Sequence, residues 1–373
     1  MKPPPAPVLQ PVSRISPSLY VAARRCLARA AWVAHGQSNT LPKHPRAMLG
    51  SAVHHVLELA GAGRLAGNTA EERRESARSG FDDKMRELFA SAHKVLQAKF
   101  SSPERLPYYN LYRERVALLA AEQASDNVTT QAGSTDGGKP RVLRETLLEA
   151  NSGKLFGRPD LVDASKGEVK DYKTGRAPED GRLRDDEARQ MRLYAHLANE
   201  NNLPVSRGIV VRADRTEEEL PITADEATAE AGEALTKLDE LNAAMGKSFY
   251  DIATPSAEAC ELCPCIATCE RFWEADFEPP EKGYLHAEGV LIEDIAPKYQ
   301  GVIGLKLDVS RGTTRRGVVY VERLTEAWLT AGGDSLPKKG DRVRVLHLRV
   351  LDDAEGSAVV AANREMTTVW QIP

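Results

Sequence analysis

The spacing of apolar residues predicts that the chain begins with helices. Residues 1–12 are rich in proline and predict a flexible tail, after which apolar residues recur at helical spacing over residues 17–34 and 45–59. Ser16 and Pro17 favour a helix start, because the hydroxyl caps free amide groups and proline fits the first turn. A capping box at Thr69–Glu72 indicates that a charged, mostly helical insert occupies about residues 60–128.

A compact β region follows the small, polar loop at residues 130–138. Three strands separated by short turns containing Gly and Ser are predicted at residues 141–150, 154–162 and 167–172. Then come, in order, a helix at 185–199, a strand at 207–212 with a possible partner at 219–222, and a helix from the Thr223–Glu226 capping box to about residue 245. Helices, three strands, a helix, a strand and a helix predict an α/β domain with a mixed sheet.

The pattern changes again from residue 283, where helical periodicity stops. Short β-rich runs occupy residues 285–295, 302–309, 317–321, 342–350 and 358–362. Several short strands in so small a region are typical of a small barrel, and we predict an all-β OB-like barrel for residues 283–373. The pair Pro279–Pro280 marks the linker, so residues 13–278 are expected to form the first folded domain.

Composition narrows the function only slightly. The net charge of −4 does not favour nucleic acid, but a slightly acidic protein can still have a basic groove. No apolar run approaches the roughly 20 residues that span a bilayer, and the N-terminus lacks an apolar signal core, so we expect a cytoplasmic protein. Most of the five cysteines are clustered, and in a reducing compartment this favours metal binding over disulfides.

The candidate chemistry lies in the predicted strand at residues 167–172 and its flanks. Side chains alternate along a strand, so Asp171 and Lys173 point to one face and Tyr172 to the other. Asp160, from the preceding turn, adds a second carboxylate. Two carboxylates and an ammonium are a set that can hold a divalent metal against a phosphate, which indicates a nuclease.

These residues stand in a pattern that resembles the PD-(D/E)XK nuclease superfamily. The flanking motifs are similar to those of its RecB-like branch, and the resemblance covers about residues 14–275. A single Asp-x-Lys would carry no weight in a charged protein, whereas several motifs in the family's order do. The motifs are, in chain order, Gly50–His54 with Leu57–Glu58, Gly157–Asp160, Asp171–Gly175 and Gln190–Tyr194.

The resemblance implies a restriction-endonuclease-like core that binds Mg²⁺ or Mn²⁺ through oxygen ligands and one histidine. The expected metal ligands are His54, Asp160, Asp171 and the backbone carbonyl of Tyr172. Lys173 is expected to position the attacking water or to stabilise the transition state.

The remaining site residues have alternatives that the sequence leaves open. Gln190 is expected to orient substrate or nucleophile, and Tyr194 to stack on a base or contact the DNA backbone. Outside the motif, Gln190 and Tyr194 would be ordinary packing residues and His54 a core or surface histidine. Glu145, on the preceding strand, would be a cross-strand partner.

The cysteines suggest a second cofactor. Cys260, Cys263 and Cys269, together with Cys26 on the first helix, resemble the iron–sulfur subgroup of these nucleases, which includes the CRISPR-adaptation exonucleases and the C-terminal domain of AddB. The resemblance implies a [4Fe–4S] cluster that staples the first helix to the end of the domain. Cys265 lies outside the pattern. A structural zinc site is the alternative, and Cys26 alone would be an ordinary buried residue.

The resemblance further implies a nuclease, most simply an exonuclease, that acts on single-stranded DNA or DNA ends. Recombination, repair or anti-phage defence are the expected settings, beside a helicase or ATPase partner. The alternative is a nuclease-derived DNA-binding or scaffold subunit, although the complete set Asp160, Asp171 and Lys173 favours the enzyme. Candidate phosphate contacts near the active-site helix, which could equally form a solvated helix face balanced by acidic neighbours, are Arg182, Arg184, Arg189 and Arg192. In the barrel, the loop that carries Arg311, Arg315 and Arg316 is also expected to contact nucleic acid.

Overall fold

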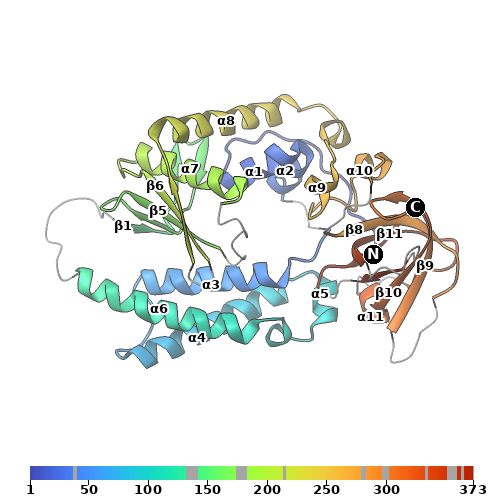
Figure 1. The fold of residues 1–373 in the computed structure, drawn as a ribbon, viewed down its shortest axis with the longest axis horizontal. Coiled ribbons are helices and arrows are strands. Elements are labelled where there is room, and N and C mark those ends of the chain that lie inside the picture. Colours follow the sequence, from blue (N-terminus) through green and yellow to red (C-terminus); the bar gives the residue numbers. More distant parts are fainter. Residues whose placement is uncertain are drawn as a thin grey trace.

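The computed structural model has a mixed α/β core, a helical lobe beneath it and a C-terminal β-barrel (Figure 1). It describes residues 1–36, 40–131, 142–173, 183–212, 216–278, 283–295, 302–331, 335–350, 359–362 and 365–372, with the backbone alone at 123–131. None of the described helices is both long and apolar enough to cross a membrane.

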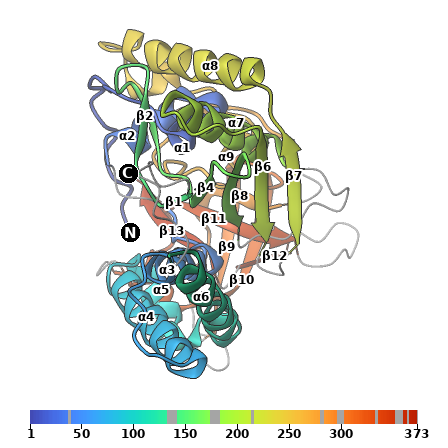
Figure 2. The same cartoon turned by 90° about the vertical axis from the view of Figure 1, so that its left-hand side faces the viewer.

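The core is a five-stranded mixed sheet, as the sequence predicts. Its strand order is β1-β4-β5-β6-β7, and only the β5–β6 pair is parallel. The helix α7 (Asp185–Glu200) makes the crossover between β5 and β6, and α8 (Ala224–Ala243) packs on α7 (Figure 2). The strands are β1 (Val142–Arg144), β4 (Leu161–Asp163), β5 (Glu168–Lys173), β6 (Arg207–Arg212) and β7 (Glu217–Pro221).

The helical lobe packs three long helices around its own apolar core. The helices are α3 (Pro45–Gly61), α4 (Ala70–Ala90) and α6 (Tyr109–Gln131), and the short α5 (Lys94–Lys99) and η1 (Pro103–Arg105) connect α4 to α6. Phe81, Met85 and Val116 are buried between them. The capping box at the start of α4 is formed as predicted, since Thr69 and Glu72 each bond the other's backbone amide.

The predicted helix at residues 17–34 is wrong in one respect, because it breaks at Cys26. That residue is extended (φ −170°, ψ 127°) and separates α1 (Pro17–Arg25) from α2 (Leu27–Ala34). The break lets the backbone amide of Thr254 donate to Cys26 Sγ at 3.4 Å, so the thiol is buried against a segment far away in the sequence. Helical periodicity continues across the break and therefore could not reveal it.

Two predicted strands are also shorter than expected. Residues 141–150 and 154–162 each split, and their inner halves, β2 (Leu148–Ala150) and β3 (Leu155–Gly157), form a separate two-stranded sheet. The split in the first occurs around Glu145, which adopts a positive φ of 45°. This backbone conformation is strained for a non-glycine residue, and strained residues often occur at functional sites.

The C-terminal part is a closed barrel, which confirms the predicted small β-barrel. Its strands are β8 (Leu285–Leu291), β9 (Val302–Gly312), β10 (Gly317–Thr325), β11 (Arg342–Val350) and β12 (Val359–Ala362). They pair in the order β8-β9-β10-β12-β11 and back to β8, with β10 and β12 parallel. A sixth strand that the sequence did not reveal, β13 (Thr368–Ile372), pairs with β11 outside the ring.

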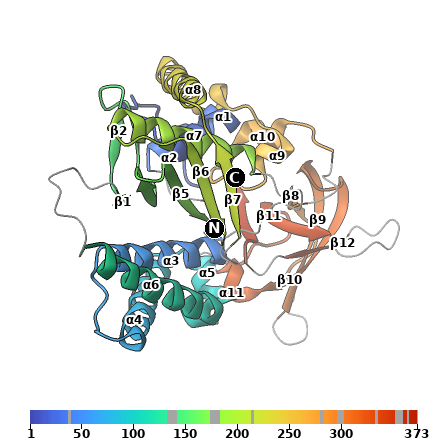
Figure 3. The ribbon, with the colours of Figure 1, turned by 60° about the vertical axis from the view of Figure 1, so that its left-hand side comes forward.

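Buried polar contacts hold the barrel against the rest of the chain. Arg344 donates to the carbonyl of Ala267 at 2.6 Å, and Lys99 of α5 donates to the carbonyl of Thr367 at 2.6 Å. Figure 3 shows α5 beside α11 (Glu326–Leu329) of the barrel. The barrel is therefore attached to the first domain at two places, at the segment around Ala267 and at the helical lobe.

The Pro-rich residues 1–12, for which the composition predicts a flexible tail, are held at three points. The carbonyl of Met1 accepts from Gln371 of β13, and the carbonyl of Pro4 accepts from Thr268 Oγ1. Val12 exchanges two hydrogen bonds with the Asn242 side chain on α8. This segment therefore runs from the barrel to the α/β core.

Candidate active site

Strand β5 presents its reactive side chains to α7. Lys173 Nζ lies 2.8 Å from Asp171 Oδ2, as their shared face of the strand predicts. Tyr172 points to the opposite side, where it packs against the core of the helical lobe. Strand alternation therefore separates the chemical pair from the residue that fixes the strand to the lobe.

Helix α7 supplies the group that holds this pair in place. Gln190 Oε1 accepts from Lys173 Nζ at 2.9 Å, and Gln190 Nε2 lies 3.3 Å from Asp171 Oδ1. The same amide nitrogen donates to Tyr194 Oη at 3.0 Å, one helical turn away. The amide orientation follows from its neighbours, since only its oxygen can accept from an ammonium and only its nitrogen can donate to a carboxylate.

Asp160 joins this arrangement to the helical lobe. Its Oδ2 accepts from the backbone amide of Tyr172 at 2.5 Å, and its Oδ1 lies 3.3 Å from His54 Nδ1 on α3. Glu145 Oε1 lies 4.0 Å from the same nitrogen. One ligand atom from each of His54, Glu145 and Asp160 falls within 4.8 Å of the others, which makes them a candidate metal site.

Glu145 is the site residue that the sequence interpretation missed. The hairpin register contained the signal: Ala150 pairs with Leu155 across the tight turn, and Arg144 pairs with Leu161 in the same register. Counting back from the turn places Glu145 directly opposite Asp160, and the Glu145 amide indeed donates to the Asp160 carbonyl at 3.2 Å. The cross-strand partner of Asp160 is thus also a member of the candidate metal site.

The carboxylates of this site repel one another. Burial raises the pKa of Asp171 to about 6, with Lys173 opposing the rise and Asp160 adding to it. Burial likewise raises the pKa of Glu145 to about 7, and the nearby Asp160 charge adds to the rise. Burial is the largest single effect on the pKa of His54 and lowers it, but the bond to Asp160 and the nearby acidic charges together raise it by more, so the net shift is upward. Crowded acids of this kind are relieved by a cation.

The donor set fits a hard divalent metal ion. It offers carboxylate oxygens and one imidazole nitrogen, which suits Mg²⁺ and, with the nitrogen, Mn²⁺. Asp171 Oδ2 is buried and lies 2.8 Å from Lys173 Nζ, and because a carboxylate oxygen has two lone pairs, one stays available for a metal ion. The backbone carbonyl of Tyr172 as a further ligand stays a prediction.

A family comparison agrees with this geometry. The family model described as PD-(D/E)XK nuclease superfamily matches residues 14–270, which is more than half of the chain. The chain belongs to the PD-(D/E)XK nuclease superfamily. The match ends before the barrel, so the barrel is an addition to the superfamily core. No curated protein matches the chain.

Glu145 gives a first test of the superfamily site in this chain. We expect Glu145→Gln to weaken Mn²⁺ binding by about tenfold or more, because it removes one negative oxygen donor beside the metal. Titration calorimetry with Mn²⁺ measures the change. Glu149→Gln is the matched control, since Glu149 lies on the adjacent β2 but is exposed and pairs with Arg14. Equal Mn²⁺ affinity in both variants would show that Glu145 does not contribute to metal binding.

Gly157 of the superfamily motif has a packing role. A Cβ atom on it would lie 3.0 Å from Tyr194 Cε1 and 2.8 Å from Leu197 Cδ1, both on α7. The absence of a side chain at this position lets α7 approach the β2–β3 hairpin closely. The glycine therefore positions the helix that carries Gln190 and Tyr194.

We expect Gly157→Ala to destabilise the fold by about 1–3 kcal/mol, since the added methyl overpacks the contact with α7. Urea denaturation measures the free energy of unfolding. Gly232→Ala is the control: Gly232 lies on α8 with open space around its Cβ position, and alanine should there be neutral or stabilise by up to about 1 kcal/mol. Equal stability of Gly157→Ala and wild type would mean that α7 can shift without strain.

The five cysteines are all free and all buried. Burial raises the pKa of Cys260 and of Cys269 to about 12, and the neighbouring thiol of Cys263 adds to both shifts. Cys26, from the break between α1 and α2, adds slightly to both pKa shifts. Among the described residues, however, the side-chain groups close enough to hold a metal ion include none of the cysteines. Cys265, expected to lie outside the set, has its sulfur 3.3 Å from that of Cys263.

The arginines near α7 pair with carboxylates other than Asp160 and Asp171. Arg189 binds Asp185, and it also binds Glu230 and Glu233 of α8. Arg192 lies 3.6 Å from Glu230, and Arg184 lies 3.8 Å from Glu187. These contacts favour the structural alternative for all three arginines.

The other candidate phosphate contacts belong to the barrel, apart from one that lies outside the residues that the structure describes. Arg311 is 3.7 Å from Glu288, and Arg316 is 2.9 Å from Asp276. Arg315 lies next to Arg316 in the same turn, and it is not free of partners either. Arg182, like Thr174 and Gly175 of the strand motif, lies outside the described residues.

Proposed function

We propose that this protein is a metal-dependent deoxyribonuclease of the RecB-like branch, acting as an exonuclease on single-stranded DNA or DNA ends. The observation that carries the proposal is the juxtaposition of the Lys173–Asp171 pair with the cluster of His54, Glu145 and Asp160. A superfamily member without activity would have no need for a complete set of metal ligands beside an oriented lysine.

Each residue has a role that follows from its chemistry. His54, Asp160 and Asp171 would hold Mg²⁺ or Mn²⁺, with Glu145 adding negative charge. When bound, the metal lowers the pKa of a water and withdraws electrons from the scissile phosphate. Lys173 places a fixed positive charge beside the metal site, where it can orient the attacking water or stabilise the charge that develops on the phosphate oxygens.

Gln190 acts through its neighbours. By accepting from Lys173 and approaching Asp171, it holds ammonium and carboxylate in a single orientation before substrate binds. The hydroxyl of Tyr194 restrains the amide in turn. The benefit is preorganisation, because a charge already in place does not have to reorganise during the reaction.

A [4Fe–4S] cluster held by Cys26, Cys260, Cys263 and Cys269 is the second part of the proposal. The support is that thiols from two distant segments are buried in one apolar core. Four thiolates suit such a cluster, and zinc is the alternative occupant. Either would tie α1 and α2 to the end of the nuclease domain.

The barrel is proposed to be OB-like and to serve as a platform for single-stranded DNA. A closed ring of five strands with a short helix between the third and fourth supports this assignment. The setting would be recombination, repair or anti-phage defence, with a helicase or ATPase partner that delivers the strand.

The direct test uses protein purified without oxygen and end-labelled single- and double-stranded DNA, with Mg²⁺ or Mn²⁺. Wild type should degrade DNA only with metal, and Asp171→Ala should not. The pattern of products from each labelled end shows whether cleavage starts at an end. DNA binding without cleavage under every metal would instead favour a DNA-binding or scaffold subunit.

A further inference from the structure

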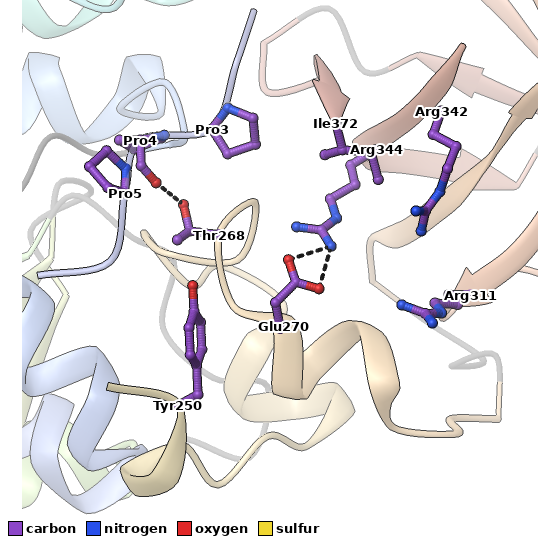
Figure 4. A pocket seen from close by; sticks show the side chains of 10 residues that line it. All are labelled: Pro3, Pro4, Pro5, Tyr250, Thr268, Glu270, Arg311, Arg342, Arg344 and Ile372. Atoms are coloured by element: carbon purple, nitrogen blue, oxygen red, sulfur yellow. Dashed lines mark hydrogen bonds and ion pairs between the residues drawn. The ribbon is translucent and has the colours of Figure 1, made fainter. Parts of the chain in front are cut away.

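A cavity of about 330 Å³ lies between the barrel, the cysteine-rich segment and the first residues of the chain (Figure 4). It is lined by residues other than those of the candidate active site. One wall carries Arg311, Arg342 and Arg344 from the barrel, and the opposite wall carries prolines and Tyr250. Its volume falls in the range of sites for small ligands.

The arginine wall has more positive than negative charge. The carboxylate of Glu288, which is fully buried, lies 2.6 Å from Arg342, 2.8 Å from Arg344 and 3.7 Å from Arg311. Glu270 binds Arg344 as well, at 2.8 Å. Three guanidinium groups therefore face two carboxylates, which leaves one net positive charge in a partly enclosed space.

Two of these arginines can still donate hydrogen bonds to a ligand. Arg344 is only 3% exposed, and its nitrogens are used by Glu288, Glu270 and the Ala267 carbonyl. Arg311 and Arg342 are 42% and 44% exposed. Within the described part of the chain, each has Glu288 as its one ion-pair partner, although a guanidinium has five N–H donors.

The opposite wall is mostly apolar and held in place. Pro3 and Pro4 face the cavity, and the Pro4 carbonyl accepts from Thr268 Oγ1. The Tyr250 side chain projects toward the cavity from below them in Figure 4. An aromatic ring is the kind of side chain on which a nucleobase packs, and the proline rings add apolar surface beside it.

We propose that this cavity binds one nucleotide, with its phosphate on Arg311 and Arg342 and its base against Pro3, Pro4 and Tyr250. Guanidinium groups pair with phosphate through two parallel hydrogen bonds, and the net positive charge favours an anion. The choice of a nucleotide rests on the proposed nuclease function, because a DNA strand is the phosphate-bearing ligand that such a protein meets. A free nucleotide has the same chemistry.

The test measures binding alone, so that it stays separate from cleavage. Asp171→Asn protein in EDTA is titrated with a 5′-labelled oligothymidylate by fluorescence anisotropy, and with thymidine 5′-monophosphate by calorimetry. The double variant Arg311→Gln/Arg342→Gln is made in this background. It leaves Glu288 paired with Arg344, and circular dichroism and thermal denaturation check that the barrel is folded.

The double variant should bind the oligonucleotide about ten- to a hundredfold more weakly, the scale of lost charge-assisted hydrogen bonds. The slope of the logarithm of its binding constant against the logarithm of the salt concentration should become shallower by roughly 0.7, as expected for one phosphate contact on a single strand. Arg86→Gln is the matched control, since Arg86 lies on α4, is exposed and pairs with Asp83. It should change neither quantity.

The two probes separate the sources of the nucleotide. Weaker binding of the oligonucleotide in the double variant supports a unit of a DNA strand as the ligand. Weaker binding of the monophosphate alone supports a free nucleotide in the same cavity. Unchanged binding of both probes by a folded double variant overturns the proposal. Because EDTA removes the Mg²⁺ or Mn²⁺ that cleavage would need, none of these outcomes depends on whether the protein cleaves DNA.

Discussion

Lys173→Met is expected to lower DNA cleavage at least about a hundredfold, the scale on which enzymes lose rate when one oriented charge-stabilising donor is removed. Methionine is close to lysine in length, so the variant removes mainly the charge that lies 2.8 Å from Asp171 and 2.9 Å from Gln190. Folding and DNA binding should be nearly unchanged. Initial cleavage rates with saturating Mn²⁺, and anisotropy in EDTA, measure the two properties separately.

Lys170→Met is the matched control for this experiment. Lys170 lies on the same strand, but on the face that carries Tyr172, and it pairs with Glu168 and Glu217 rather than with Asp171. Its replacement should leave the cleavage rate within about twofold, because surface ion pairs contribute little. Wild-type cleavage by Lys173→Met would show that Lys173 is not the stabilising cation.

Cys260→Ser is expected to lose the proposed cluster and to lower the free energy of unfolding by more than about 3 kcal/mol, a large share of the total stability of a domain. The reason is that a serine oxygen is a poor replacement for a thiolate, and the segment around Cys260 would lose its link to Cys26. Metal analysis for iron and zinc in protein purified without oxygen, with urea denaturation of the same samples, measures both effects.

Cys265→Ser is the control, because its position lies outside the proposed ligand set. It should keep the metal and most of the stability, although its sulfur lies 3.3 Å from Cys263 Sγ. Loss of metal in Cys265→Ser but not in Cys260→Ser would contradict the proposed ligands. Zinc in place of iron in the wild-type protein would leave the proposed link between the two segments intact but would identify it as a zinc site.

Much of the arrangement of side chains on β5 was predictable because its geometry is local. Side-chain alternation along a strand places Asp171 and Lys173 together, and helical spacing places Gln190 and Tyr194 together. His54 and Asp160 are far apart in the sequence, and it was the resemblance to a nuclease family, not periodicity, that joined them. Their separation of 3.3 Å agrees with that expectation.

Periodicity and residue spacing predicted most of the elements in their order, the mixed character of the sheet, the small barrel and the faces on which the reactive side chains lie. These properties depend on backbone periodicity, which acts between neighbours. The break at Cys26, the position of Glu145 opposite Asp160 and the binding of Arg189 to α8 became apparent only in the folded chain. Such features depend on which distant segments pack together. A helix break, a strained backbone conformation or an ion pair is stable only when the segment that packs against it is in place.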